Sequence, residues 1–452
     1  MAADLGQGKD GRDRLGPMIQ RDIDVVVFGA TSITGRHVAA YLAQRASERP
    51  ELHWAVAARD GSKAERVLAE EGVKPPETIV ADVGNPSSLA AMASRAIVVL
   101  NLVGPYTLYG EPVIEACVDA GSHYADLTGE IPFVRRMNTA FDARARAGGI
   151  KIVQVCGFEA LPPDLGVALA AEAAAEAGEQ LLEVDLETRI VLQPTLPRPS
   201  DVLSGGTLQS IAAVAGDPEV ACILDPGCLV ADPGAAQAVR LRSPIRVRPR
   251  RRDSTVIAPM SPAAFINPAV IHRSAALRAE EHGEPFTPFA YSEGLAIGGS
   301  TASLPVRYAV AGTLSGIQGV MGLLAHATRP DVGRAVSRFV ARTLPTSGYG
   351  PARDRLERWR WEMSIQARTA TSRELRVEIS ADGHPGYLTT PRMLGEVGLL
   401  LSEAGSTPDR FGCLTPSTAL GTSSAGRFAR AGLRFSLPSA ATPLHRTFHD
   451  SP

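Results

Sequence analysis

The sequence predicts an α/β protein, with an N-terminal doubly wound parallel sheet followed by a second, mixed α/β (α+β) region. Strand and helix signals alternate from Asp24 to about Val155, as expected for parallel strands joined by crossover helices. The first unit, VVVFGATSITGRHVAAYL at residues 25–42, is typical of a buried strand, a turn of small residues and the start of a helix. Later segments, such as LLEVDLETRIVL at residues 181–192, alternate as a half-buried strand does.

Short apolar runs predict six strands in the N-terminal region. They are Val25–Phe28, Trp54–Ala58, Thr78–Ala81, Ile97–Asn101, His123–Asp126 and Ile152–Val155. Helical periodicity predicts the segments between them. These are Gly35–Arg45, Ser62–Glu71, Pro86–Ser94, Gly110–Ala120 and Ile131–Ala147. Six strands with crossover helices predict the dinucleotide-binding arrangement known as the Rossmann fold.

The second region mixes helices with longer strands. Its predicted helices are Leu165–Ala177, Thr390–Ala404 and Thr415–Leu420, and its predicted strands are Leu181–Leu192, Trp359–Thr369 and Glu374–Ser380. The last two strands are expected to form an antiparallel pair. We expect the Pro/Ser-rich stretch Pro194–Ser204 to be a loop.

The composition of the 452-residue chain excludes several classes of function. A net charge of −2 gives no electrostatic case for nucleic-acid binding. The histidines and cysteines show no metal-binding spacing, so no metal site is predicted. The five cysteines form no CxxC pair and are odd in number, so we expect reduced thiols and a cytoplasmic protein. The first twenty residues lack the apolar core of a signal peptide and are predicted to be disordered.

The turn after the first strand predicts a pyrophosphate site. Gly29 permits a tight turn and close approach of a phosphate, and Gly35 permits close packing of helix and strand. The backbone N–H groups at the start of the helix point toward the anion. Serine replaces the usual middle glycine of the motif. The predicted contacts are Gly29, Thr31, Ser32, Ile33, Thr34 and Gly35.

The end of the second strand distinguishes the two nicotinamide cofactors. Arginine at this point suits the 2′-phosphate of NADP, whereas an acidic residue would bind the ribose of NAD. Arg59 therefore favours NADP, with Ser62 and Lys63 as helpers, although Asp60 would serve NAD instead. Asp82, after the third strand, is predicted to border the adenine; the alternative is an ordinary turn residue.

The end of the fourth strand is predicted to hold the nicotinamide ribose, because ligands collect at the carboxyl ends of parallel strands. The residues concerned are Asn101, Val103, Gly104 and Pro105. Tyr106 would follow them, close to the position of hydride transfer. The alternative for Tyr106 is an ordinary packed tyrosine.

Four motifs together resemble a known family. They are GATSITG, NLVGPYTLYGEPVIEAC, GSHYADLTGE and VCGFEALPPDLG. The chain resembles the saccharopine-dehydrogenase-like oxidoreductases, and within them is most similar to the trans-acting enoyl reductases of actinobacterial lipid and polyketide pathways. Weaker similarity in SGGTLQS, NPAVIHRS, HPGYLTTPRMLGE and LTPSTALG extends the resemblance over most of residues 22–436.

The resemblance implies NADP-dependent hydride transfer to an unsaturated acyl chain, presented as a small molecule or on an acyl carrier protein. It also implies a division of the chain: a tail at 1–21, a Rossmann domain at 22–160, a substrate domain at 161–400, and a segment at 401–452 that packs back on the Rossmann domain. Two residues depart from the family pattern. Ser32 replaces a glycine, and His384 stands where the family tends to have aspartate.

Reduction of an enoyl group requires a donor to the substrate oxygen and a proton for the α-carbon. Tyr106 is predicted as the oxygen-stabilising donor, and His123 as a second donor or proton relay; the alternative for both is plain packing. Glu130 and Glu159 are further acid/base candidates, with helix capping as their alternative. A ketone or imine reductase remains an alternative enzyme, and a lipid-associated binding protein without turnover is an alternative of another class.

Two segments suggest partners. Tyr308–Ala327 is uncharged over twenty residues, which favours a buried helix pair or an apolar surface for an acyl tail over peripheral membrane contact. The arginine-rich segment Arg240–Arg252 is a candidate docking site for an acidic carrier protein, with a solvated loop as the alternative. A homodimer is the candidate assembly.

Overall fold

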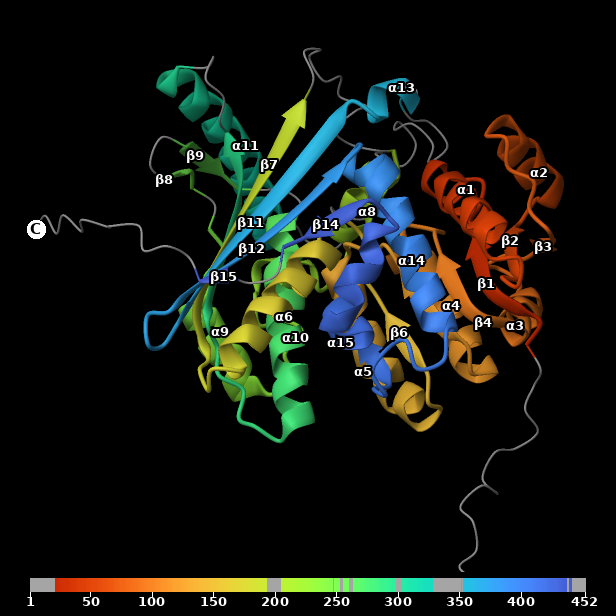
Figure 1. The fold of residues 1–452 in the computed structure, drawn as a ribbon, viewed down its shortest axis with the longest axis horizontal. Helices are drawn as coiled ribbons and strands as arrows, with labels where there is room; N and C mark the ends of the chain where they lie inside the picture. The colour runs from red at the N-terminus through yellow and green to blue at the C-terminus, as the bar shows by residue number, and fades with distance from the viewer. Residues whose placement is uncertain are drawn as a thin grey trace, which may run out of the picture.

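The computed structural model describes residues 21–192, 205–246, 248–252, 255–259, 263–297, 303–327, 351, 353–436 and 439–440. They form two β-sheets, A and B, that lie side by side with helices packed on both (Figure 1). Residues 1–20 of the predicted tail and the predicted loop at 194–204 lie outside the described residues.

Sheet A is the predicted parallel sheet. Within the described residues it has seven strands, in the order β13-β6-β5-β4-β1-β2-β3. Their bounds are β1 Ile23–Phe28, β2 Trp54–Ala58, β3 Thr78–Val80, β4 Ala96–Asn101, β5 His123–Asp126, β6 Lys151–Val153 and β13 Gly412–Leu414. All neighbours pair in parallel, so the predicted doubly wound α/β fold is confirmed. The strand β13 was not predicted, and it joins the sheet beside β6.

Both faces of sheet A are buried. Alternate residues of β1 enter different cores: Val25 and Val27 face one, Val26 and Phe28 the other. The first core includes residues of α1 (Ile33–Glu48), α2 (Gly61–Glu70) and α14 (Thr390–Ser402), and the second includes residues of α3 (Pro86–Arg95), α4 (Tyr106–Ala120) and α5 (Ile131–Ala147). Helix α4 begins four residues before the predicted Gly110, so Tyr106 belongs to a helix and not to the preceding loop.

Sheet B is mixed, as predicted for the second region. Its order is β14-β12-β11-β7-β10-β9-β8, with β15 paired to β12. The bounds are β7 Leu181–Leu192, β8 Arg250–Arg252, β9 Thr255–Ala258, β10 Ala290–Ile297, β11 Trp359–Thr369, β12 Glu374–Asp382, β14 Leu433–Phe435 and β15 Ser439–Ala440. The pair β7–β10 is parallel, whereas β11 is antiparallel to both β7 and β12.

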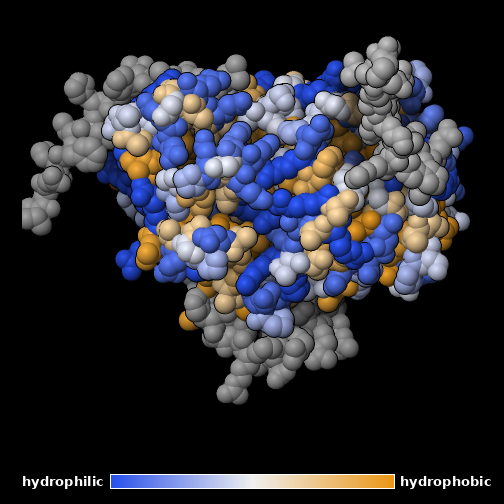
Figure 2. Space-filling view, turned by 90° about the horizontal axis from the view of Figure 1, so that it is seen from below, coloured by the Kyte–Doolittle hydropathy of each residue, from blue (hydrophilic) through white to orange (hydrophobic). Residues whose placement is uncertain are grey.

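One face of sheet B packs on helices and the other is polar. The inward residues Trp361, Met363 and Ile365 of β11 join the same core as α6 (Leu161–Ala175). The alternate residues, such as Glu362 and Arg368, are partly exposed, and Arg368 forms an ion pair with Glu183 at 2.8 Å. Figure 2, which views the whole molecule from below, shows hydrophilic residues over much of the surface on that side, with apolar ones scattered among them.

The other described helical segments lie between strands of sheet B or, along the chain, between the two sheets. They are α8 Gly205–Ala215, η1 Val220–Leu224, α9 Pro233–Arg242, η2 Ala263–Phe265, α10 Asn267–His282, α11 Leu304–Ala327, α13 Arg353–Leu356, η3 Pro385–Thr389, α15 Pro416–Leu420 and η4 Thr422–Ala429. Helix α11 contains the predicted apolar segment and packs through Ala311 on Val256 and Ala258 of β9. Within the part of the chain that the structure describes, no helix has the length and hydropathy needed to cross a membrane.

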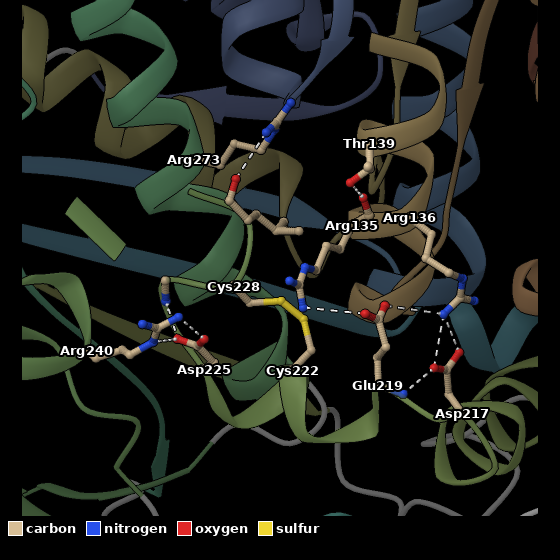
Figure 3. Close-up of a disulfide and its surroundings, with 12 residues drawn as sticks. Arg135, Arg136, Thr139, Asp217, Glu219, Cys222, Asp225, Cys228, Arg240 and Arg273 are labelled. Carbon is tan, nitrogen blue, oxygen red and sulfur yellow. Dashed lines mark hydrogen bonds and ion pairs between the residues drawn. A yellow bond between two sulfur atoms is a disulfide. The ribbon is translucent and has the colours of Figure 1, made fainter. Parts of the chain in front are cut away.

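The cysteines correct one expectation. Cys222 and Cys228 form a disulfide, whereas reduced thiols were expected throughout (Figure 3). The chain turns after η1 and brings these two residues to a Cα–Cα distance of 5.7 Å, which six residues of sequence separation alone did not reveal. Cys117, Cys156 and Cys413 are free and buried. The same region is joined to α5 by ion pairs, including Arg136 with Asp217 at 2.8 Å (Figure 3).

Helix α14 is held on sheet A by a buried carboxylate. The hydroxyl of Tyr41 on α1 donates to Glu396 Oε2 at 2.7 Å, and Arg427 Nε donates to Glu396 Oε1 at 3.0 Å. Arg427 also pairs with Glu403 at 2.7 Å. Gly395 allows the close approach, because a Cβ there would lie 2.5 Å from the Tyr41 ring. Figure 1 shows the resulting neighbours, α14 and α1, which come from opposite ends of the chain.

We predict that Arg427→Leu destabilises the fold. Glu396 is completely buried, and loss of Arg427 leaves its charge with the Tyr41 hydroxyl as its remaining hydrogen-bond partner among the described residues. The free energy of unfolding should fall by about 3 kcal/mol, as for other broken buried ion pairs. Urea denaturation followed by circular dichroism measures this. The control is Arg434→Leu, which breaks an exposed pair with Asp382 and should cost less than about 1 kcal/mol. Equal, small effects would contradict the anchoring role.

Candidate functional site

The predicted site residues gather because the strands of sheet A are parallel. The carboxyl ends of β1, β2 and β4 lie at one edge of the sheet, with Phe28 in register with Ala57 and Asn101. The turns that follow these strands contain most of the residues predicted to bind the cofactor. This edge is the usual ligand site of open parallel sheets.

The turn after β1 has the geometry that a pyrophosphate needs. Gly29 adopts a φ of +95°, and a Cβ there would lie 2.9 Å from the carbonyl carbon of Leu102. At Gly35 a Cβ would collide with the backbone of Gly29. Both positions therefore require glycine, because a side chain would push the turn away from β4 or α1 away from the turn.

Ser32 is the N-cap of α1. Its Oγ accepts from the Gly35 N–H at 3.0 Å and donates to the Gly29 carbonyl at 2.9 Å. The hydroxyl is thus directed into the turn, which offers a local reason for serine in place of the middle glycine. The N–H groups of Ile33 and Thr34 have no acceptor among the described residues, so the helix start keeps free donors for an anion.

Arg59 and Asp82 come together at the ends of β2 and β3. Their side chains lie 4.0 Å apart, and the Arg59 side chain is 84% exposed. Asp60, the alternative residue for NAD, instead caps α2: its Oδ1 accepts from the Lys63 N–H at 2.9 Å. Asp82 accepts from the Gly84 N–H at 2.8 Å, as a turn aspartate does. Arg59 is therefore an exposed cation at this edge, beside the first turn of α2, which contains Ser62 and the exposed Lys63.

A buried network joins the ends of β4, β5 and β6. Asn101 Nδ2 donates to the Tyr124 hydroxyl at 3.1 Å, and that hydroxyl donates to Asp126 Oδ2 at 2.8 Å. Asp126 Oδ1 accepts from the N–H groups of Thr128 and Val155. Burial raises the pKa of Asp126 to about 7. Asp126 was not among the predicted site residues, although its place at the end of a predicted strand was a usable signal.

Val155, which follows β6 at the same edge of sheet A, has an unusual backbone conformation. Its φ is +63°, an uncommon conformation for a β-branched residue. The hydrogen bond from its N–H to Asp126 holds it there. Strained residues of this kind concentrate at functional sites, so Val155 supports the carboxyl edge as the site.

Tyr106 lies at this edge, but its hydroxyl is already engaged. It donates to the Asn101 carbonyl at 3.1 Å and is approached by the Leu127 N–H at 3.4 Å. Burial holds the pKa of Tyr106 well above its usual value. The N–H groups of Tyr106 and Thr107 donate to Glu130, which is the capping arrangement given as the alternative for that carboxylate.

The turn between β4 and α4 contains Val103, Gly104 and Pro105. The Val103 N–H donates to Asn101 Oδ1 at 3.0 Å, which ties the turn to the buried network. Pro105 is the N-cap residue of α4. The three residues predicted to contact the nicotinamide ribose therefore lie together with Asn101 and Tyr106.

His123 is not part of this group. It begins β5, at the amino end of the strand, whereas the cofactor edge is the carboxyl end. Its Nδ1 accepts from the Lys151 N–H at 3.0 Å. Burial, with the charges of Lys151 and Arg21, lowers the pKa of His123 to about 4. This placement corrects the expectation that His123 lies near the nicotinamide, and the ring is packed as its alternative predicted.

His384 acts as a cap. Its Nδ1 accepts from the N–H groups of Gly386 and Tyr387 at 3.1 and 3.2 Å. The ring lies between Trp359 and Tyr387, with centroid distances of 4.2 and 4.9 Å. An aspartate at this position would accept from the same N–H groups, so the departure preserves the local hydrogen bonds.

These features fit NADP. Gly29 and Gly35 keep the turn close to β4 and to the start of α1, where the N–H groups of Ile33 and Thr34 are available to a pyrophosphate. Arg59 is exposed where the 2′-phosphate of the adenosine ribose would lie.

Comparison with known proteins identifies the family. Residues 25–153 match the family described as the saccharopine dehydrogenase NADP binding domain. Over 428 residues, 91% of this chain and 97% of its relative, the sequence is 34% identical to a Mycobacterium tuberculosis protein that carries the provisional name of trans-acting enoyl reductase. A trans-acting enoyl reductase of Mycobacterium ulcerans is 31% identical over 438 residues, 94% of this chain and 99% of that protein.

The fold has a counterpart among solved structures. Apo saccharopine dehydrogenase (L-Glu forming) from Saccharomyces cerevisiae superposes with a TM-score of 0.50 at 12% identity. The match covers 92% of this chain and 99% of that one, so both sheets share the arrangement. Because the relatives exceed 30% identity over nearly their whole length, the chain belongs to the saccharopine-dehydrogenase-like family of NADP-dependent oxidoreductases, together with the proteins named trans-acting enoyl reductases.

Proposed function

We propose that this protein reduces the carbon–carbon double bond of an unsaturated acyl thioester in lipid or polyketide synthesis. The name and high coverage of the enoyl reductase relatives carry this proposal. The geometry of sheet A also supports it. The turn after β1, Arg59 after β2 and Asn101 at the end of β4 all lie at the carboxyl ends of neighbouring parallel strands.

In this proposal, different residues would bind different parts of the cofactor. The turn from Gly29 to Gly35 and the start of α1 would hold the pyrophosphate, and Arg59 the 2′-phosphate. The bound cofactor would supply a hydride. Asn101, held by Tyr124, would fix the turn at Val103 beside the nicotinamide.

Tyr106 has one hydroxyl proton, and the Asn101 carbonyl accepts it. A substrate oxygen would have to replace that carbonyl before Tyr106 donated to it. We therefore assign Tyr106 a positioning role. Direct donation from its hydroxyl to the substrate oxygen would overturn this assignment.

The test of the function compares three probes. NADPH oxidation should be measured with crotonyl-CoA, with a simple ketone and with a cyclic imine. Turnover of crotonyl-CoA alone supports the proposal. Turnover of the ketone or imine instead would favour the alternative reductase, and failure to bind NADPH would contradict both.

The role of Arg59 predicts a cofactor-specific loss. Arg59→Ala should weaken NADPH binding by about 10- to 100-fold, because a charge-assisted phosphate contact contributes about 1.5–3 kcal/mol. NADH binding should change little, since NADH lacks the 2′-phosphate. Fluorescence titration measures both affinities. Arg66→Ala, an exposed arginine on α2, is the matched control and should bind NADPH normally. Equal weakening of NADPH and NADH would contradict this assignment.

Tyr106→Phe separates positioning from direct donation. Loss of a hydrogen bond that only holds the turn should reduce kcat on crotonyl-CoA by about tenfold or less. A fall of about 100-fold or more would instead indicate donation to the substrate oxygen. Thermal melting of the variant serves as the control for intact folding.

Carrier-protein docking predicts a substrate-dependent loss. Arg240 and Arg250 pair with Asp225 and Asp185, so the exposed residues Arg242, Arg246 and Arg248 are the better docking candidates. The triple arginine-to-serine variant should raise KM for a carrier-bound enoyl substrate about tenfold and leave crotonyl-CoA kinetics unchanged. An equal effect on both substrates would argue against docking.

Homodimer formation, cytoplasmic location and peripheral membrane contact stay predictions.

A further inference from the structure

A second polar group lies on the inner face of sheet B. Glu293 of β10 accepts hydrogen bonds at Oε2 from Asn267 Nδ2 at 2.7 Å and from the Tyr291 hydroxyl at 2.8 Å. Asn267 is the first residue of α10 and is 2% exposed. Because Tyr291 and Glu293 are two residues apart on one strand, both point toward the packed face of the sheet.

Several atoms of this group have no partner. Glu293 Oε1 and Asn267 Oδ1 are buried, and neither has a hydrogen-bond partner among the described residues. Thr188 Oγ1 on β7 is likewise buried and has no hydrogen-bond partner among the described residues. Register places Thr188 diagonally from Glu293 on the same face, because Leu186 pairs with Glu293 and Thr188 with Leu295. Buried polar atoms are rarely left unpaired, so their concentration here indicates a site for a polar ligand group.

The group borders the cofactor edge of sheet A. Ile266, just before Asn267, packs with Val155 and Ala160, which follow β6. Its Cδ1 would also lie 2.8 Å from a Cβ on Gly129, in the loop after β5. The N-terminus of α10 therefore lies against the loops at the carboxyl ends of β5 and β6, where the nicotinamide is expected.

The surroundings of Glu293 shift its titration toward neutral pH. Burial raises the pKa of Glu293 to about 7, although hydrogen bonds from Asn267 and Tyr291 and the charge of Arg250 act in the opposite direction. A carboxyl group with this pKa is suited to proton transfer at neutral pH.

We propose that Glu293 donates the proton to the α-carbon of the substrate, and that Asn267 and Tyr291 position its carboxyl group. This role rests on the proposed enoyl reduction. The O–H bond at Oε1 breaks, and a C–H bond forms at the α-carbon with the electron pair released from the carbon–carbon double bond. The remaining carboxylate is held by the Asn267 amide and the Tyr291 hydroxyl, and water returns the proton.

The variant that tests this role is Glu293→Gln. Glutamine keeps the size of the side chain and an oxygen that accepts from Asn267 and Tyr291, but it cannot supply the proton. With crotonyl-CoA and NADPH, kcat should fall about 100-fold or more, with NADPH affinity and melting temperature unchanged. Glu362→Gln, the same change on the outer face of sheet B, is the control and should retain wild-type kcat.

The pH profile gives a sharper readout. A donor must be protonated, so wild-type kcat should fall as pH rises through about 7, the pKa of Glu293. This alkaline limb should be absent from the residual activity of Glu293→Gln. The other ionisable groups that act on the cluster are Tyr291 on the same strand, Arg250 on β8, whose charge lowers the pKa of Glu293, and Asp185 and Asp164, which act on Tyr291 from β7 and α6. These groups stay in place in the variant.

Infrared spectroscopy of the protein without cofactor supplies a readout independent of turnover. The wild type should show a protonated carboxyl band of Glu293 that titrates near pH 7 beside that of Asp126, and Glu293→Gln should lose the Glu293 band and keep the Asp126 band. Activity or an alkaline limb retained by Glu293→Gln, or an unchanged infrared band, overturns the donor role. Wild-type protein that binds NADPH but does not reduce crotonyl-CoA contradicts the enoyl reductase function itself, and the donor role with it.

Discussion

Sheet A has to be covered on both faces, because its parallel strands are apolar on both sides. Helices α3, α4 and α5 cover one face. On the other face, α1 and α2 cover one half of the sheet, and α14 packs over β1, β4 and β5. The segment that completes the cofactor sheet is therefore nearly 300 residues away from β4 in sequence. The fold therefore depends on the chain coming back to sheet A with α14 after it has formed strands of sheet B.

The return also joins the two sheets. Beyond α14 the chain adds β13 to sheet A, and Arg273 of α10 donates to the carbonyl of Cys413 in that strand at 2.7 Å. Asp164 of α6 accepts from the Ser417 N–H at 2.8 Å, just after β13. Helices that pack on sheet B are thus hydrogen-bonded to the C-terminal part of sheet A. These contacts fix the helices on the inner face of sheet B to β13 of sheet A and to the residues that follow it.

Local patterns predicted the fold well, and long-range contacts explain what they missed. The strand, turn and helix at residues 23–48 and the gathering of Asn101 with Arg59 follow from short apolar runs and from the parallel arrangement. The strand β13 has three residues and depends on β6 for its formation, so no local signal marked it. His123 was misplaced because its closeness to β4 in sequence was given more weight than its position as the first residue of the predicted strand His123–Asp126, which is the end opposite the cofactor edge. Glu293 was missed because its neighbour Asn267 comes from another element, and sequence alone does not pair them.

Asp126 and Glu293 are two carboxyl groups that differ in their hydrogen bonds although their pKa values are similar. Their hydrogen bonds, rather than their pKa values, distinguish the roles of the two residues. Burial raises the pKa of both Asp126 and Glu293 to about 7. Asp126 accepts from Tyr124, Thr128 and Val155, so both of its oxygens are engaged and it holds three strand ends together. Glu293 is engaged at Oε2 and unpartnered among the described residues at Oε1. The carboxyl group of Asp126 therefore serves to hold backbone and side-chain donors, whereas that of Glu293 is positioned through one oxygen and has no donor among the described residues at the other. The same shift in pKa therefore accompanies a structural role in Asp126 and is suited to a chemical one in Glu293.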